Sequence, residues 1–155
     1  MYNFFEGGIR GGLTFVNKHF ACASDDTELL YIDINNLYGW ALSQKLPYQK
    51  FQWVLRDDIL QDILTECQNN DLESLNYGYV MEVDIVVPDE VQDYLDQFPV
   101  AAEAKCQPGS KVKKLLLTHE TKCNSVVHWS LLLMYLSLSA KLVKIHRAIR
   151  FRQAA

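Results

Sequence analysis

The segment Gly78–Pro88, "GYVMEVDIVVP", constrains the fold most, because apolar residues occupy every second position in it. The apolar positions are Tyr79, Met81, Val83, Ile85 and Val87. Glu82 and Asp84 fall between them. Successive side chains of a strand point to opposite faces, so this period of two predicts a strand that is buried on one face and polar on the other. Such a strand needs a sheet with apolar elements packed on its buried side.

Residues before this strand predict one further strand and two helices. The apolar run Leu29–Asp33 predicts a short strand that ends on a carboxylate. The residues after it predict a short helix capped by Asn35 or Asn36. Asp57–Gln68 carries apolar residues at helical spacing, and it predicts a second helix.

Residues after the central strand predict a helix and a basic strand. Ser125–Ala140 is apolar and predicts a core helix. Lys141–Gln153 alternates, and it predicts a strand. We expect one face of this strand to be apolar, with Val143, Ile145, Ile149 and Phe151. We expect the other face to be polar and basic, with Lys144, His146, Arg150 and Arg152.

These elements predict a mixed α/β fold of the α+β type, in which helices pack on a small mixed or antiparallel sheet. The length of 155 residues suits about one domain. Signals for antiparallel hairpins are weak, and we expect exposed loops at Gly7–Gly12 and Gln107–Lys111. No apolar stretch reaches the roughly 18 to 20 residues of a membrane span, and we expect no membrane partner and no signal peptide.

The four cysteines, Cys22, Cys67, Cys106 and Cys123, are widely spaced and form no C-x-x-C motif. This spacing argues against a disulfide framework or a zinc ribbon, although one bridge remains compatible with it. A reducing compartment, the nucleus or the cytoplasm, is the expectation.

Charge is divided unevenly along the chain. Residues 1–104 carry 5 basic and 18 acidic groups, a net charge of 5 − 18 = −13. Residues 105–155 carry 10 basic groups and 1 acidic group, a net charge of 10 − 1 = +9. The basic part predicts a surface for a polyanion such as DNA. The alternative is that the two parts attract each other within the fold.

Three segments, in this order, resemble a protein-primed family B DNA polymerase of the virus-like transposon, linear-plasmid and phage type. Ile9–Gly12 resembles the Tyr-x-Gly-Gly loop of that family. Asp33–Gly39, "DINNLYG", resembles its motif A, Asp-x-x-Ser-Leu-Tyr-Pro, and is followed by the "LPY" of Leu46–Tyr48. Tyr135–Gln153 resembles the pattern YLxLGxKxxKIHRxxxFxQ of the transposon relatives.

The resemblance implies roles for the motif A residues. Asp33 would be one of two palm aspartates that hold Mg²⁺, as catalytic residue and metal ligand, and the carbonyl of Ile34 would hold the nucleotide-side metal. Backbone N–H groups of Asn36, Leu37 and Tyr38 would bind the triphosphate, and the Tyr38 ring would reject a ribose 2′-hydroxyl. The partners implied are a DNA primer-template, a deoxynucleotide and a terminal protein primer.

The resemblance also divides the chain. Residues 1–28 would be a template-loop segment, and residues 29–155 a partial palm with an inserted region, truncated before the fingers. Arg10, Gly11 and Gly12 would approach a template phosphate. We further predict DNA contacts from Lys144, Arg150 and Arg152, as well as from Lys111, Lys113 and Lys114.

The sequence departs from the family in several places. Ile9 replaces Tyr, Asn36 replaces Ser, and Gly39 replaces Pro. Neither motif B, Lys-x-x-x-Asn-Ser-x-Tyr-Gly, nor motif C, Asp-Thr-Asp-Ser, occurs in the 155 residues. We therefore expect a fragment of the polymerase that is catalytically silent alone. The alternative is a non-enzymatic DNA-binding or interaction domain derived from a transposon polymerase.

Two other constellations have competing interpretations. Glu82 and Asp84 share a strand face and could bind a cation, although ion pairing on a solvated face is favoured. His119, Cys123 and His128, with Cys106 as a fourth ligand, could bind zinc. His128 lies in an apolar segment, which favours a packed core histidine instead.

Overall fold

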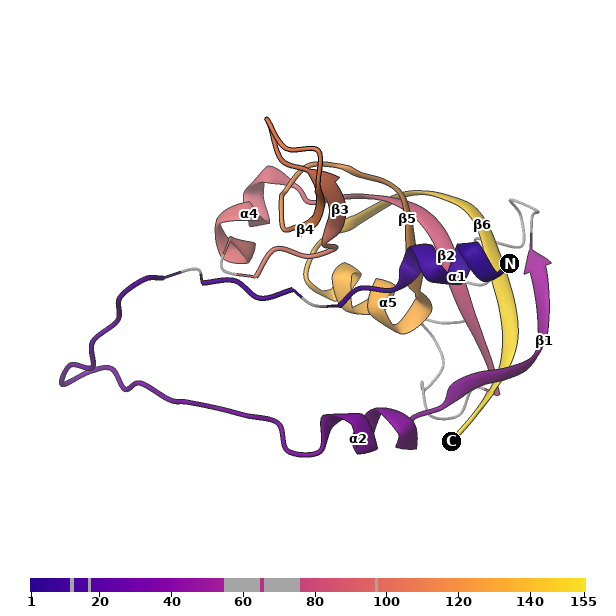
Figure 1. Ribbon diagram of the computed structural model, residues 1–155, viewed down its shortest axis with the longest axis horizontal. Coiled ribbons are helices and arrows are strands. Elements are labelled where there is room, and N and C mark those ends of the chain that lie inside the picture. The colour runs from indigo at the N-terminus through magenta and orange to yellow at the C-terminus, as the bar shows by residue number, and fades with distance from the viewer. Residues whose placement is uncertain (12, 17, 55–64, 66–75, 97) are drawn as a thin grey trace.

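A computed structural model shows the chain as a mixed α+β fold, as the sequence predicts (Figure 1). The structure describes residues 1–155 apart from 12, 17, 55–64, 66–75 and 97. The predicted helix Asp57–Gln68 therefore falls outside the described residues, apart from Thr65. None of the helices in the described part of the chain is long and apolar enough to span a membrane.

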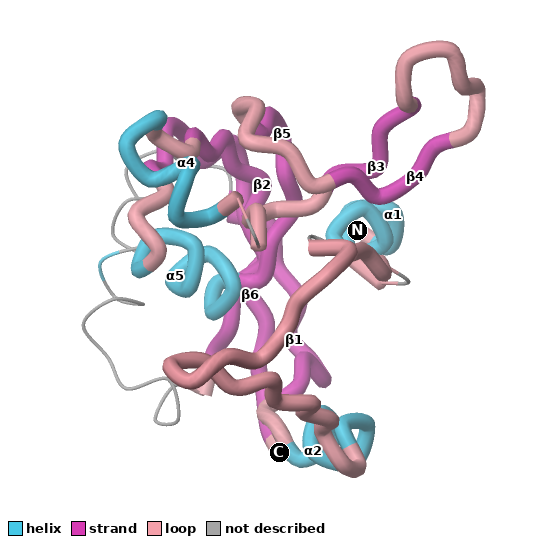
Figure 2. The backbone as a smooth tube through the Cα atoms, turned by 90° about the vertical axis from the view of Figure 1, so that its left-hand side faces the viewer, coloured by secondary structure: helices cyan, strands magenta, loops and turns pink. Residues whose placement is uncertain are grey.

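A four-stranded sheet in the order β1-β6-β2-β5 organises the molecule. Its strands are β1 (Leu46–Val54), β2 (Tyr77–Val86), β5 (Lys122–His128) and β6 (Lys141–Ala154). All three neighbouring pairs are antiparallel. β6 thus pairs on both sides, whereas β1 and β5 are the edge strands (Figure 2).

Four short helices and a hairpin complete the described elements. The helices are α1 (Tyr2–Gly8), α2 (Leu37–Ser43), α4 (Asp89–Leu95) and α5 (Trp129–Ser137). The hairpin joins β3 (Glu103–Cys106) to β4 (Lys113–Leu116). Its connecting loop is exposed, as predicted for Gln107–Lys111, and turns at Gly109, where φ is +79°.

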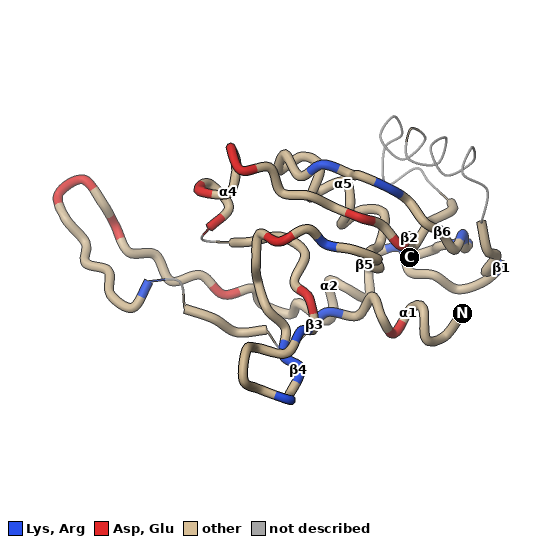
Figure 3. Tube along the Cα trace, turned by 90° about the horizontal axis from the view of Figure 1, so that it is seen from above, with Lys and Arg blue, Asp and Glu red and all other residues tan. Residues whose placement is uncertain are grey.

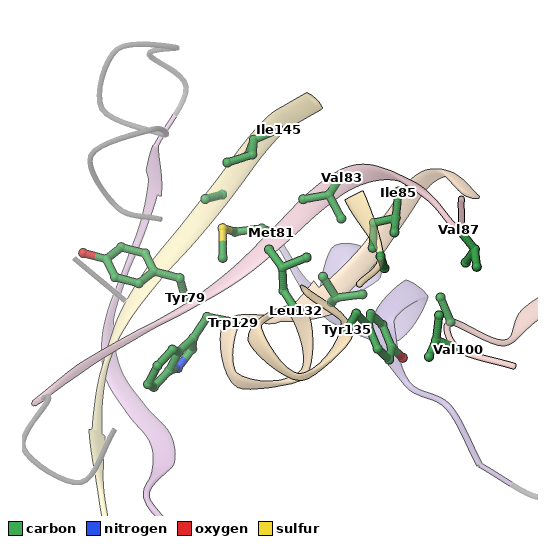
Figure 4. Packing of buried hydrophobic residues seen from close by; sticks show 14 of the residues in the cluster. Tyr79, Met81, Val83, Ile85, Val87, Val100, Trp129, Leu132, Tyr135 and Ile145 are labelled. Atoms are coloured by element: carbon green, nitrogen blue, oxygen red, sulfur yellow. The ribbon is translucent and has the colours of Figure 1, made fainter. Parts of the chain in front are cut away.

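The main core lies between β2 and α5 (Figure 4). The alternation predicted for β2 is confirmed, because Tyr79, Met81, Val83 and Ile85 all belong to this core. Helix α5 packs Trp129, Leu132 and Tyr135 against them. Each such side chain, when fully buried, contributes about 1.5–3 kcal/mol through the apolar surface it removes from water.

A second core covers the opposite face of the sheet. Phe4 from α1 packs there with Val80, Val126, Ile149 and Phe151. The predicted loop Gly7–Gly12 is therefore partly wrong, because Gly7 and Gly8 form the last residues of α1. Helix α1 forms since its aromatic residues gain a buried site on the sheet.

Two predicted elements differ from the structure. Residues 29–33 form no strand, because no described strand pairs with them. The predicted helix Ser125–Ala140 begins only at Trp129, since Lys122–His128 forms β5. Val126 faces one core and Val127 the other, so this strand is apolar on both faces and resembles a buried helix in sequence.

β6 contains two register irregularities that change which side chains share a face. They lie opposite Glu82/Val83 and Asp84/Ile85 of β2. A bulge inserts one residue and so reverses the side-chain alternation beyond it. Consequently Ile145 packs in the core beneath α5, whereas Ile149 and Phe151 pack beneath α1.

The predicted common face of Lys144, His146, Arg150 and Arg152 is therefore wrong. Lys144 pairs with Asp84 and lies on the α1 face, whereas Arg150 pairs with Tyr79 and lies on the α5 face. His146 shares the α1 face, because it reaches the Asp84 carboxylate. Arg152 shares the α5 face with Arg150, two residues away.

Candidate nucleotide and nucleic-acid site

The residues that resemble motif A lie on an exposed segment rather than at the end of a strand. Asp33 is exposed, and its Oδ1 accepts a hydrogen bond of 2.9 Å from the Ile34 N–H. Tyr38 is 89% exposed, and Ile34 is 64% exposed. The carboxylate and the ring thus both face solvent, where they can meet a ligand or a further protein segment.

Helix α2 begins directly after this segment, as the sequence predicts. Asn36 precedes it in the left-handed conformation, with φ at 53°, which asparagine adopts more readily than most residues. The Asn36 side chain makes no capping hydrogen bond but lies over the first turn, where a Cβ on Gly39 would come within 2.4 Å of it. Glycine at this position fits that packing.

The residues present do not make a complete magnesium site. Asp33 and the Ile34 carbonyl supply oxygen ligands of the type that Mg²⁺ prefers, but they include one carboxylate only. Within the described residues, no three His, Cys, Asp or Glu side chains gather closely enough to hold a metal ion. A two-metal centre at this position would need carboxylates from elsewhere.

A basic and aromatic cluster, formed by Tyr48, Lys50, Tyr77, Arg150 and Arg152, lies at the end of the sheet next to α2. The chain passes from α2 into β1, whose Leu46 pairs with Ala154 at the end of β6. Figures 1 and 2 both place α2 beside the C-terminus. Arg152 pairs with Gln49 of β1 on one side and Tyr77 of β2 on the other.

Tyr77 is the centre of this cluster. The guanidinium of Arg150 lies 4.0 Å from the Tyr77 ring centroid, and that of Arg152 lies 5.7 Å from it. A hydrogen bond with Arg152 and the positive charges of Arg152, Arg150 and Lys50 lower the pKa of Tyr77 below its usual value. Tyr48, which is 55% exposed, also interacts with Arg152.

Lys50 reaches the cluster because the backbone of β1 is irregular. Its φ is 57°, and the register of β1 shifts between Gln49 and Gln52. The left-handed region costs a residue such as lysine on the order of 1–2 kcal/mol. Strained residues of this kind concentrate at binding and catalytic sites.

The acidic pair on the other face of the sheet is ion-paired, as favoured from the sequence. Glu82 accepts a short hydrogen bond from Nε of Arg147, and Asp84 Oδ1 lies 2.9 Å from Nε2 of His146. The backbone N–H of Asn124 donates to Asp84 at 2.8 Å, and this bond, with His146, holds the pKa of Asp84 below its usual range. These partners occupy both carboxylates, so the pair is not an open cation site.

The predicted template-loop residues lie away from the cluster. Arg10 donates from Nε to the Ala102 carbonyl at 2.8 Å and from an Nη group to the Gly7 carbonyl at 2.6 Å. This arginine fastens the N-terminal segment to the body. Gly11 is exposed, and Gly12 falls outside the described residues. Their contact with a template stays a prediction.

The lysines of the β3–β4 hairpin form a separate basic region (Figure 3). Lys111, Lys113 and Lys114 are exposed. Lys105 instead pairs with Glu103 at 3.0 Å and with Glu120 at 2.9 Å. Some basic residues therefore pair within the fold, whereas the hairpin lysines face solvent, and their contact with DNA stays a prediction.

The histidines and cysteines considered for zinc are not brought together. His128 stacks on Phe151 with ring centroids 6.1 Å apart, and its Nδ1 lies 2.7 Å from the Ser130 hydroxyl. Burial lowers the pKa of His128 to about 4. His119 lines a separate cavity of about 520 Å³. His128 is thus a packed core histidine, as the sequence favours, and Cys22, Cys106 and Cys123 are exposed free thiols.

Sequence reasoning missed Tyr48, Lys50 and Tyr77 as members of the candidate site. Their positions depend on the pairing of three strands that are far apart in the chain. The one local signal is that aromatic residues stand at the start of β1 and β2. Comparisons of the chain with protein families, with curated proteins and with solved structures find no match.

Proposed function

We propose that this chain is part of a protein-primed family B DNA polymerase, and that it contributes the motif A segment and part of the palm. The observation that carries the proposal is the sequence Asp33–Gly39, which leads into α2 at the end of the sheet that holds the basic and aromatic cluster. Exposure of Asp33 and Tyr38 supports this role, because both side chains must meet a nucleotide.

The proposed reaction of the parent enzyme is addition of a deoxynucleotide to a primer 3′-hydroxyl or to a hydroxyl side chain of a terminal protein. Mg²⁺ would supply charge stabilisation for phosphoryl transfer in the complete site. Asp33 and Ile34 are this chain's contribution to that site. With one carboxylate present, the chain alone is catalytically silent.

Nucleotide binding tests this proposal without requiring catalysis. Calorimetric titration with dTTP and with UTP, each with Mg²⁺, should show Mg²⁺-dependent binding that favours the deoxynucleotide. Asp33→Asn should abolish the Mg²⁺ dependence, and Tyr38→Val should remove the preference for deoxyribose. Asp26→Asn is the matched control, since it removes an exposed carboxylate from the same segment. Equal loss in Asp33→Asn and Asp26→Asn would contradict the proposal.

Primer extension tests whether the chain is silent. We expect no extension from a primed template with Mg²⁺ and all four deoxynucleotides. Extension that disappears in Asp33→Asn would show that the second carboxylate is available to the chain, and the statement that the chain is silent would be wrong.

A second candidate function is nucleic-acid binding without catalysis. The cluster around Tyr77 favours it, because three cations and two tyrosines gather there whether or not a metal site is complete. In that case DNA binding would be independent of Mg²⁺ and unchanged in Asp33→Asn, and no nucleotide preference would be found.

A further inference from the structure

The cluster of Tyr48, Lys50, Tyr77, Arg150 and Arg152 gathers three positive charges around two tyrosine rings. Three other basic residues have carboxylate partners: Arg147 pairs with Glu82, and both Lys105 and Lys122 pair with Glu103. Among the described residues, no ion pair joins Lys50, Arg150 or Arg152 to a carboxylate. Like charges held this close repel each other, and a bound anion would relieve that repulsion.

The guanidinium groups are held in place before any ligand arrives. Arg150 and Arg152 project from the same face of β6, two residues apart, and both lie over the Tyr77 ring. Their positions are fixed by the ladder between β2 and β6 and by cation–π contact. A preorganised pair of guanidinium groups suits phosphate, whose oxygens accept their hydrogen bonds.

The hydrogen-bonding capacity of Arg150 is not met within the described part of the fold. Its Nε is shielded from solvent and has no hydrogen-bond partner there. Arg150 also contacts the ring of Tyr77, which offers no strong acceptor along its face. None of the described residues therefore supplies a hydrogen-bond acceptor for the Nε–H of Arg150.

The surroundings favour a polymer over a small anion. The three cations are distributed over two strands, β1 and β6, and Tyr48 stands beside them with 55% of its surface exposed. Exposed aromatic rings along a basic surface are the arrangement that binds single-stranded nucleic acid, in which bases stack while phosphates meet the cations.

We propose that Lys50, Arg150 and Arg152, with the rings of Tyr48 and Tyr77, bind the phosphates and bases of a single nucleic-acid strand beside the motif A helix. The inference rests on the nucleic-acid contact in the proposed function and deepens it, but it does not require catalysis. Lys144 takes no part, because the bulge in β6 places it on the opposite face.

Fluorescence anisotropy with a labelled 20-nucleotide oligo(dT) tests the site on the full chain. Three cations that each displace a counterion predict a slope of about −2 in a plot of log affinity against log salt concentration. Arg150→Gln/Arg152→Gln should reduce the magnitude of that slope by about 1.4 and weaken binding at least about tenfold. Lys113→Gln/Lys114→Gln removes the same charge from the hairpin and is the matched control.

A substitution at Lys50 distinguishes an effect on nucleic-acid binding from an effect on stability. Lys50→Gly removes a cation and relieves the left-handed backbone, so it should weaken binding without lowering the Tm. Lys144→Gln should leave affinity within about twofold. Circular dichroism and the Tm of each variant establish that it is folded before its affinity is compared.

Several outcomes would overturn the inference. Equal loss in the hairpin control would mean that binding follows total charge alone. Displacement of the oligonucleotide by dTTP or inorganic phosphate at similar concentrations would assign the cluster to a small anion. Tighter binding of a 20-base-pair duplex would exclude a single-strand site. Asp33→Asn should leave strand binding intact, so failure of the polymerase proposal is distinguishable from failure of this one.

Discussion

At the scale of single residues, close packing explains why position 78 of β2 is a glycine. Gly78 of β2 pairs with Phe151 of β6, and the Phe151 ring, which is fully buried, crosses directly over it. A Cβ at this position would lie 2.4 Å from Phe151 Cε2 and 2.5 Å from Gln153 Oε1. The glycine thus makes room for an aromatic ring on the neighbouring strand.

Gly78→Ala should destabilise the fold by about 2 kcal/mol, since the ring must leave its position in a packed core. Urea denaturation of wild type and variant measures the change. Gly11→Ala is the control, because a methyl group on Gly11 would have no neighbouring atom within 4 Å. Equal stability of Gly78→Ala and wild type would mean that Phe151 has a second position of similar energy.

His128 makes stability depend on pH. Burial lowers its pKa to about 4, so the unfolded chain binds the proton more tightly than the folded one. Its contribution is fully present above the unfolded pKa of about 6.5 and is lost as pH falls toward the folded value. Between pH 7 and pH 5 the free energy of unfolding should therefore fall by about 2 kcal/mol through this residue.

Urea denaturation at these two pH values measures the effect. His128→Gln should remove most of the difference, and His19→Gln, at an exposed histidine, should retain it. A pH dependence that is unchanged in His128→Gln would mean that His128 is not the source of this acid sensitivity.

At the scale of elements, one buried lysine joins the β3–β4 hairpin to the sheet. Lys122, at the start of β5, is fully buried and lies 3.1 Å from Glu103 Oε2 of β3. Its Nζ also donates to the Thr118 carbonyl at 2.9 Å and to the Thr118 hydroxyl at 2.7 Å. The charge is tolerated because three acceptors surround it.

Lys122→Met should destabilise the fold by about 3 kcal/mol, since it leaves two oxygens of Thr118 without their donor and removes one of the two lysines that pair with the Glu103 carboxylate. Lys122→Met/Glu103→Leu should recover much of that loss, because an apolar pair replaces the ion pair. The free energies of unfolding of both variants measure this. A double variant less stable than the single one would show that Glu103 has a further role.

The sequence predicts best those strands whose own residues alternate between apolar and polar. The alternation in Gly78–Pro88 specifies β2 and the face that packs against α5, and Lys141–Gln153 marks β6 to within a residue. The other face of β2 is expected from the sequence to be polar, but Val80 packs there in the second core. The bulges in β6 leave no mark in the periodicity of the sequence. A regular alternation therefore places Lys144 and Arg150 on one face of the sheet, whereas the bulge between them places them on opposite faces. β5 is apolar on both faces, so its sequence lacks the alternation that predicts a strand. The partners of Tyr77 depend on the register between β2 and β6, which the sequence does not reveal.

At the scale of the whole molecule, a long exposed segment stands out from the packed sheet (Figure 1). This arm, residues 18–35, reverses at Ser24–Thr27, where the backbone N–H and carbonyl of each residue bond the other. Its returning half carries Leu30 at 81% exposure and Tyr31 at 93%. Such an apolar surface favours contact with another protein surface.

The arm should therefore make the isolated chain self-associate as its concentration rises. Leu30→Gln/Tyr31→Gln should shift the chain toward monomer without lowering its unfolding free energy, because neither side chain is packed. Sedimentation velocity over a range of concentrations measures the shift. Val143→Gln, at an exposed position on β6, is the control and should not change association.

The order of strands in the sheet sets a condition on how the protein is made. Because β6 lies between β1 and β2, neither strand can complete its ladder until β6 has left the ribosome. Leu46, for instance, cannot pair until Ala154 has been synthesised. Until β6 is made, the edges of β1 and β2 that it joins therefore stay unpaired. Pairings this distant along the chain also slow folding, so the nascent protein is a natural client for chaperones.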